Sequence, residues 1–126
     1  MQRRKDERGA AVVEFALILP VLVLFVFGIV EFGRAYSARI ELTAAVREGA
    51  RAVALGANTA DAENATKDGA PGLDRDRIVV TPNSCTVAPA PANATVNATY
   101  QFEYTIPLVR TGTWTLKAKG VMRCGG

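Results

Sequence analysis

The chain of 126 residues contains no histidine and only two cysteines. Without histidine, the usual general acid–base catalysts, the Ser-His-Asp and Cys-His nucleophile systems and nearly all zinc sites are excluded. We therefore expect no catalytic residue, no metal and no cofactor. The net charge of +3 is small, and four of the bases (Arg3, Arg4, Lys5 and Arg8) lie in the first nine residues. Composition thus gives no indication of nucleic-acid binding.

Charge is also nearly missing from residues 10–30, AAVVEFALILPVLVLFVFGIV, where Glu14 is the only ionisable residue. As a helix, this run would extend roughly 31 Å, the thickness of a hydrocarbon core. It is apolar on every side, which favours lipid over the surface of a small head. We expect a helix over residues 10–56, with about 10–33 spanning the membrane. Pro20 should kink this helix without ending it.

Residues 1–9 form a basic leader before the apolar run. By the positive-inside rule, the leader stays in the cytoplasm and the rest of the chain lies in the periplasm or outside. A removed signal peptide fits the basic start, but the run is too long and no Ala-x-Ala-like site follows it. An ordinary, uncleaved signal anchor is the other alternative.

Glu14 calls for an explanation because an acid inside a spanning helix raises the free energy of insertion. In one interpretation the carboxylate, roughly 6 Å into the run from Ala10, snorkels to the interface. In the other, a break after Gly9 gives Ala10 a free ammonium group, and Glu14 pairs with the ammonium of a neighbouring copy. Glu31, at the other end of the run, is expected to reach water and to tolerate substitution better.

The charged leader ending in Gly9 and the following residues 10–15, AAVVEF, resemble the prepilin cleavage motif of type IV pilin-like proteins. The continuation through EFALILP (14–20) and FGIVEFGR (27–34) is similar to the TadE-like family of tight-adherence (Flp-type) pilus systems. Residues 114–124 resemble the last strand of that family more loosely.

The resemblance implies a pilin-like protein with a globular head, acting as a minor pilin or pseudopilin subunit of a tight-adherence pilus or a related secretion apparatus. A prepilin peptidase would cut between Gly9 and Ala10. Further partners would be other pilin-like subunits, the assembly machinery and inner-membrane lipid of a bacterium. One alternative is an uncleaved single-pass protein whose periplasmic head binds a ligand or partner. A membrane-tethered enzyme is the third possibility, with no catalytic set to support it.

Beyond the membrane the helix changes character and becomes amphipathic. The residues that fall on one helical face are Leu42, Ala45, Val46, Gly49 and Val53. Gly56 can cap the helix. A stripe of small residues (Ala35, Ala38, Ala45 and Gly49) would permit close approach of another helix, but we expect most of it to dock the head's own sheet.

Residues 57–126 predict a small α+β head. Asn58 or Thr59 can cap a short helix over about 60–68, closed by Gly69, and residues 78–81 form a strand. The segment 88–94, APAPANA, is a linker too rich in proline for the interior of a sheet.

A clear hairpin follows the linker. Apolar and polar residues alternate strictly from Val96 to Ile106. A turn over 107–112 leads to a second alternating strand, with Trp114, Leu116, Ala118 and Met122 on its core face. The fold class is therefore α+β: a long membrane-spanning helix with a small antiparallel sheet packed on its distal half.

Cys85 and Cys124 would both face an oxidising compartment, so we expect a disulfide, with two buried free thiols as the alternative. Closing a loop of about 40 residues would contribute roughly 4 kcal/mol on the chain-entropy model. Five acidic residues could suggest a calcium loop: Asp61, Glu63, Asp68, Asp74 and Asp76. Their spacing does not match an EF-hand, so a solvated charged turn is favoured. The Asn-Ala-Thr triplets at Asn64, Asn93 and Asn97 are assigned no role.

Overall fold

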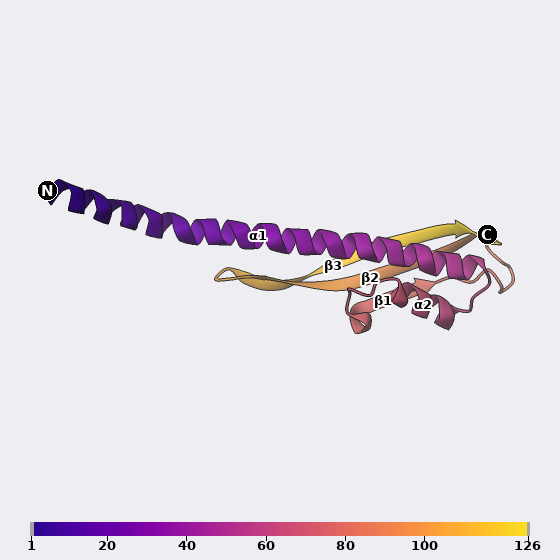
Figure 1. The fold of residues 1–126 in the computed structure, drawn as a ribbon. Helices are drawn as coiled ribbons and strands as arrows, with labels where there is room; N and C mark the ends of the chain where they lie inside the picture. Colours follow the sequence, from indigo (N-terminus) through magenta and orange to yellow (C-terminus); the bar gives the residue numbers. More distant parts are fainter. Residues whose placement is uncertain (1, 126) are drawn as a thin grey trace.

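The structure, a computed structural model, describes residues 2–125. Its elements are α1 (Gln2–Ala54), α2 (Thr59–Asp68), the 3₁₀ turn η1 (Arg75–Arg77), β1 (Ile78–Pro82), β2 (Asn93–Ile106) and β3 (Arg110–Arg123). Figure 1 shows α1 as a rod, with the remaining elements gathered along its C-terminal half. This confirms the predicted α+β class, with a long helix and a small antiparallel sheet.

α1 is one continuous helix that includes the leader. It begins at Gln2, well before the predicted start at residue 10. The leader is rich in Arg, Lys and Glu, which are good helix formers, and therefore nothing in it interrupts the helix. The helix also continues through Pro20, as predicted. It ends at Ala54, where Gly56 takes a φ of +93° and donates its N–H to the carbonyl of Val53.

The C-terminal half of α1 packs on the sheet through the predicted face. Leu42, Ala45, Val46 and Val53 have no exposed surface. They meet the inward side of β2, whose buried residues are Ala94, Val96, Ala98, Tyr100 and Phe102. Residues of alternating polarity on β2 thus supply the apolar layer that the helix covers.

Glycine brings β3 unusually close to α1. A Cβ built at Gly120 would lie 2.2 Å from the carbonyl oxygen of Val46. Any side chain here would push the strand away from the helix backbone. Gly49 plays a similar part for α2, since its Cβ would lie 1.9 Å from Oγ1 of the buried Thr66. The small residues of α1 therefore dock the protein's own head, as expected.

The three strands are antiparallel in the order β1-β2-β3. β2 and β3 pair along their whole length, from Asn93↔Arg123 to Ile106↔Arg110. The hairpin loop is therefore only residues 107–109, shorter than the predicted 107–112. β2 begins at Asn93, inside the predicted linker 88–94. Trp114 has the predicted parity, opposite the buried Phe102, but is itself 51% exposed.

α2 matches the predicted short helix. Asn58 caps it, with Oδ1 accepting a hydrogen bond of 2.8 Å from the amide of Asp61. Ala62 and Thr66 face the core. The Thr66 hydroxyl is satisfied internally by the carbonyl of Ala62, at 2.8 Å, so its burial leaves no polar group unpaired.

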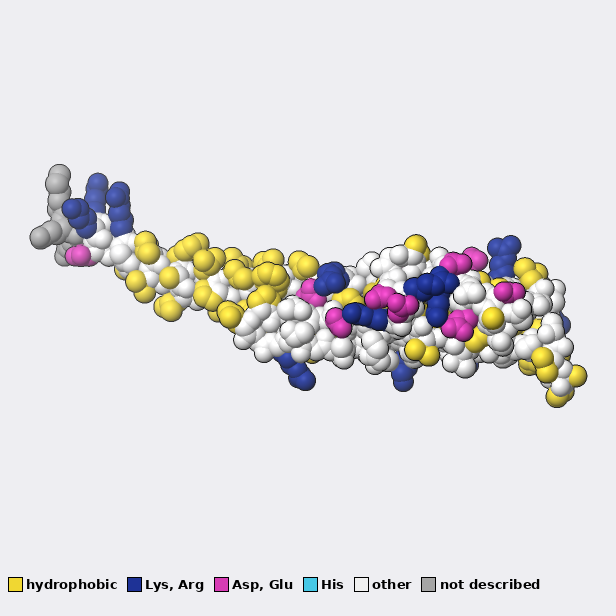
Figure 2. All heavy atoms as spheres, turned by 90° about the horizontal axis from the view of Figure 1, so that it is seen from below, with side chains coloured by type: hydrophobic (Ala, Val, Ile, Leu, Met, Phe, Trp, Pro, Cys, Tyr) yellow, Lys and Arg dark blue, Asp and Glu magenta, His cyan; other side chains and the backbone are white. Residues whose placement is uncertain are grey.

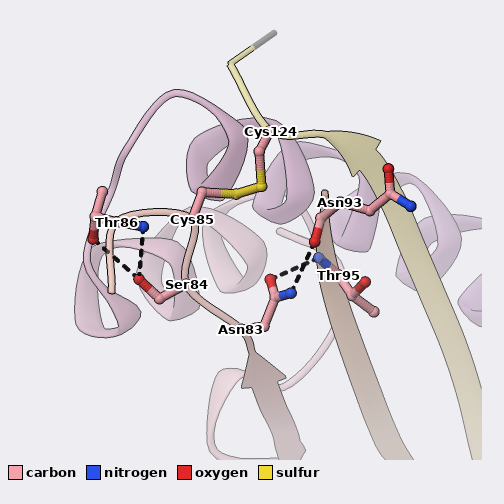
Figure 3. The surroundings of a disulfide bond; sticks show 7 residues. All are labelled: Asn83, Ser84, Cys85, Thr86, Asn93, Thr95 and Cys124. Carbon is pink, nitrogen blue, oxygen red and sulfur yellow. Dashed lines mark hydrogen bonds between the residues drawn. A yellow bond between two sulfur atoms is a disulfide. The ribbon is translucent and has the colours of Figure 1, made fainter. Parts of the chain in front are cut away.

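Cys85 and Cys124 form the predicted disulfide, with a Cα–Cα distance of 5.8 Å. It ties the loop after β1 to the end of β3 (Figure 3). Beside it, Asn83 accepts from the amide of Thr95 at 2.8 Å and donates to the carbonyl of Asn93 at 2.9 Å. The bond and this side chain together hold the loop against the end of β2 that is farthest from the hairpin tip.

Candidate functional site: the exposed half of α1

The N-terminal half of α1 projects from the head with its apolar side chains uncovered. Its most apolar stretch of 18 residues has none of its residues buried inside the protein. Large side chains are exposed all round it, among them Phe15 at 63%, Leu17 at 71% and Phe25 at 69%. In Figure 2, basic side chains lie at one end, followed by a length covered with hydrophobic atoms and then by the charged head. α1 is therefore long and apolar enough to anchor the protein in a membrane.

Gly9 and Ala10 lie on the exposed surface of α1, between the basic leader and the apolar length. A Cβ built at Gly9 would have nothing within 4 Å. A larger residue at this position would therefore leave the fold intact, and any effect it has must arise outside this chain's own packing.

Glu14 lies four residues beyond Ala10 on α1 and is also exposed. That separation corresponds to about 6 Å along the axis. Among the described side chains, Glu14 takes part in none of the ion pairs, which are confined to residues 31–103. Within one copy, the structure thus leaves this carboxylate available to lipid, water or a second molecule.

Glu31 closes the other end of the apolar length, and here the expectation of free access to water was wrong. Its side chain is only 14% exposed. Oε1 accepts from Nη1 of Arg34 at 2.8 Å, and Oε2 lies 3.4 Å from the amide of Thr105 on β2. The Arg34 guanidinium in turn lies over the ring of Phe102, 5.5 Å from its centroid. Glu31 therefore joins the helix to the hairpin.

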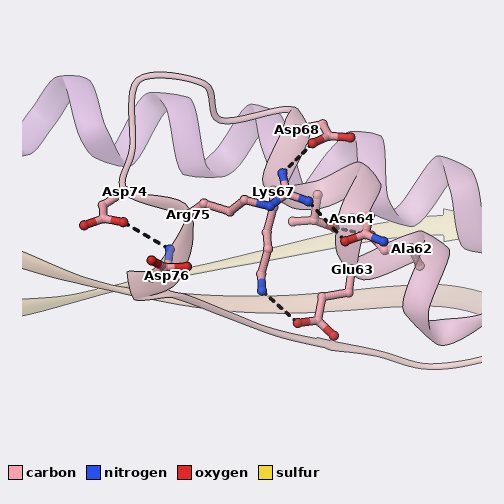
Figure 4. A network of polar contacts seen from close by, with 9 residues as sticks. Ala62, Glu63, Asn64, Lys67, Asp68, Asp74, Arg75 and Asp76 are labelled. Carbon is pink, nitrogen blue, oxygen red and sulfur yellow. Dashed lines mark hydrogen bonds and ion pairs between the residues drawn. The ribbon is translucent and has the colours of Figure 1, made fainter.

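Three of the five acidic residues considered for a calcium loop, Glu63, Asp68 and Asp74, have partners within the chain. Lys67 binds Glu63, Arg75 binds Asp68, and Asp74 caps η1 by accepting from the amide of Asp76 at 3.1 Å (Figure 4). Over residues 2–125, no group of three or more His, Cys, Asp or Glu side chains is placed to hold a metal ion. The arrangement agrees with a solvated charged turn.

Sequence reasoning missed the contact between α1 and the hairpin around Glu31. The spacing of Glu31 and Arg34, three residues apart on a helix, was a signal for an ion pair. The approach of Thr105 was not foreseeable, because it depends on how far the hairpin runs back along the helix. The predicted residues Gly9, Ala10, Glu14 and Pro20 all lie on the exposed half, far from the disulfide.

Comparison with known proteins gives one match. The family model described as TadE-like protein matches residues 9–51, which are most of α1. The match begins at Gly9 and covers the apolar length and most of the face that packs on the sheet, from Leu42 to Gly49. No curated protein and no solved structure matches the chain.

Proposed function

We propose, from the match of residues 9–51 to the TadE-like family model, that this chain is a TadE-like protein associated with tight-adherence pili and acts as a minor pilin or pseudopilin: a structural subunit rather than a catalyst. In this proposal a prepilin peptidase cuts after Gly9 on the cytoplasmic face of a bacterial inner membrane. The head lies in the periplasm, and α1 packs into a pilus, its initiating complex or a related secretion apparatus.

The observation that carries this proposal is the exposure of the apolar half of α1, where no residue of the most apolar 18-residue stretch is buried, beside a single acid, Glu14. Lipid covers such a helix before assembly, and the helices of other subunits can cover it afterwards. Each copy keeps its own head packed on the other half of α1. The assembling surface and the folding surface of the helix are therefore separate.

Glu14 would specify how neighbouring helices align. After cleavage, the new ammonium of Ala10 is the nearest strong cation that a second subunit can bring to this depth. A carboxylate and an ammonium that meet in a medium of low dielectric stabilise each other, whereas either one alone is destabilising. The distance of about 6 Å between Ala10 and Glu14 would set the axial offset between the two subunits.

The direct test is to replace Gly9 with leucine and to determine the mature N-terminus by mass spectrometry. We expect Gly9→Leu to leave a full-length precursor in the membrane, because the peptidase must approach the scissile bond closely. Gly33→Leu is the matched control: a Cβ at Gly33 also has nothing within 4 Å, and it lies far from the cut. The parent and this control should both begin at Ala10.

An intact leader in the parent protein would contradict processing and would favour the uncleaved anchor. Normal processing of Gly9→Leu would show that Gly9 does not define the cut.

A further inference from the structure

The β2–β3 hairpin runs back along α1 toward the N-terminus, beyond the rest of the head (Figure 1). Two crossings fix its level on the helix. Gly120, the partner of Val96, lies against the backbone of Val46. Further along, the amide of Thr105 lies 3.4 Å from Oε2 of Glu31. Over the nine residues from Val96 to Thr105, the hairpin thus passes the fifteen residues of α1 from Val46 back to Glu31.

The tip of the hairpin continues past Glu31. If the hairpin continues to pass α1 at the same ratio of strand residues to helix residues, the three residues from Thr105 to Leu108 bring the tip level with about residue 26 of α1. This level is roughly 7 Å beyond Glu31 along the helix axis. Leu24 and Gly28 are the partly buried residues among 10–30. They continue, at spacings of four and three, the face that leads through Glu31 to the sheet. The tip therefore lies beside the apolar length of α1.

The tip, residues 106–109, is itself apolar: Ile106, Pro107, Leu108 and Val109. Leu108 is fully exposed and Val109 is 64% exposed. No charged residue occurs between Glu103 and Arg110. At the level where α1 presents bare apolar side chains, the hairpin presents bare apolar side chains as well.

Neither the backbone conformation of the turn nor contacts within the chain explain why a leucine occupies position 108. Its φ is +64°, in the left-handed region that Gly and Asn adopt with less strain. A branched side chain raises the energy of this backbone, and a fully exposed side chain gains nothing from burial within the chain. Contact with an apolar phase outside the chain would supply the missing stabilisation.

Aromatic residues lie on the hairpin between its tip and the rest of the head. Trp114 is 51% exposed and lies 5.4 Å, centroid to centroid, from the ring of Tyr104. Trp114 also lines one shallow groove with Phe32 and Tyr36 of α1. Trp and Tyr concentrate where a membrane meets water. These rings place that boundary next to Glu31 and leave residues 106–109 on its apolar side.

We propose that the hairpin tip, residues 106–109, inserts into the acyl chains of the leaflet on the head's side of the membrane. This inference rests on the proposed placement of α1 across the membrane. A single helix lets a head tilt and rotate, whereas a second contact holds it in one orientation. The protein would thus present Glu14 and the head to a neighbour at a fixed angle before assembly.

The test uses full-length protein in vesicles of phosphatidylcholine and phosphatidylglycerol. Because both native cysteines are bonded, a cysteine introduced by Leu108→Cys can be labelled alone with an environment-sensitive dye. We expect quenching by nitroxide-labelled lipid and protection from aqueous iodide. Val121→Cys is the matched control: it is 55% exposed on β3 of the same hairpin, close to Gly120 and hence to the level of Val46. It should show the opposite behaviour.

Phe25→Cys reports on α1 itself, since Phe25 is 69% exposed within the apolar length. If lipid quenches the label at 25 but iodide quenches the label at 108, the tip is in water and the inference is wrong while the spanning helix stands. If lipid quenches neither, the membrane placement fails and the inference fails with it. A tip label protected from both quenchers would mean that protein covers the tip, which also overturns lipid contact.

A second variant separates apolarity from the shape of the turn. Leu108→Asn suits the left-handed backbone and removes the apolar side chain. With the dye at Val109→Cys, we expect this variant to lose lipid quenching and to gain iodide quenching, while the disulfide-bonded head stays folded. Unchanged quenching would show that Leu108 does not drive insertion.

Discussion

The two halves of α1 form one uninterrupted helix, but their apolar side chains are arranged differently. The N-terminal half carries large apolar residues on every side and leaves them exposed, as at Phe15 and Phe25. The C-terminal half confines its apolar residues to one face, where Leu42 and Val46 are fully buried. Apart from the N–H that Pro20 lacks, both halves have the backbone hydrogen bonds of an α-helix. The side chains therefore decide which surroundings each half requires.

This difference separates association from folding. In the N-terminal half, side chains have little to pack against within the chain, so a substitution there should change contacts with lipid or with other subunits. In the C-terminal half, the same kind of substitution should change the stability of the head. Substitutions placed in each half, and at the border between them, can test this separation.

The largest effect is expected at Glu14. Glu14→Ala should enter the membrane at least as well as the parent, because the carboxylate opposes insertion, and cleavage after Gly9 should survive. Association should weaken by about 3–5 kcal/mol, since the ammonium of a neighbouring Ala10 is left unpaired. The measurement is co-purification with pilus components. Glu14→Asp is the control that retains the charge, and it should keep part of the association.

Full co-purification of Glu14→Ala would assign Glu14 to snorkelling at the interface. The uncleaved anchor would then gain support over the pilin-like subunit.

Breaking the disulfide should give the next largest effect and should affect only the head. Closing a loop of 39 residues contributes roughly 4 kcal/mol on the chain-entropy model. Urea unfolding of the head in detergent, followed by the fluorescence of the single Trp114, should shift by about that amount on reduction. Membrane insertion should not change, because the apolar half of α1 makes no contact with either cysteine. Two alkylatable thiols in unreduced, denatured protein would contradict the bond.

A single methyl group tests how closely the head packs on the C-terminal half of α1. Gly120→Ala places a Cβ 2.2 Å from the carbonyl oxygen of Val46, on backbone that cannot move aside. We expect a loss of about 1–3 kcal/mol in the same unfolding assay. Gly33→Ala adds the same group where nothing lies within 4 Å and should leave the stability of the head unchanged. Equal stability of the two variants would show that strand and helix are not held this closely.

Much of this architecture could be predicted from local patterns. The alternation from Val96 to Phe102 and the helical face from Leu42 to Val53 each bury one side of an element, so polarity reveals the buried side. The cap at Asn58 and the break after Ala54 are equally local, because a side-chain oxygen and a glycine determine them.

The errors arose where geometry between distant segments decides the outcome. The full pairing of β2 with β3 drew residues 110–112 into the ladder and shortened the loop. The leader is an exception with a local cause: its Arg, Lys and Glu residues favour a helix, so α1 begins at Gln2. The burial of Glu31 depends on Thr105, which is 74 residues away in sequence. No local pattern contains that contact.

The smallest effect is expected at Glu31, on the border between the halves. The ion pair with Arg34 is weak because Arg34 is 58% exposed, and the bond to Thr105 is long at 3.4 Å. Glu31→Ala should therefore destabilise the head by only about 1 kcal/mol. It should also speed hydrogen exchange at the Thr105 amide, because the acceptor is gone. Glu31→Gln removes the charge but keeps an oxygen that can accept from Thr105, so exchange there should stay slow. If both variants exchange as slowly as the parent, the hairpin is held by its aromatic contacts with α1 and not by Glu31, and the border between the two halves is set by packing alone.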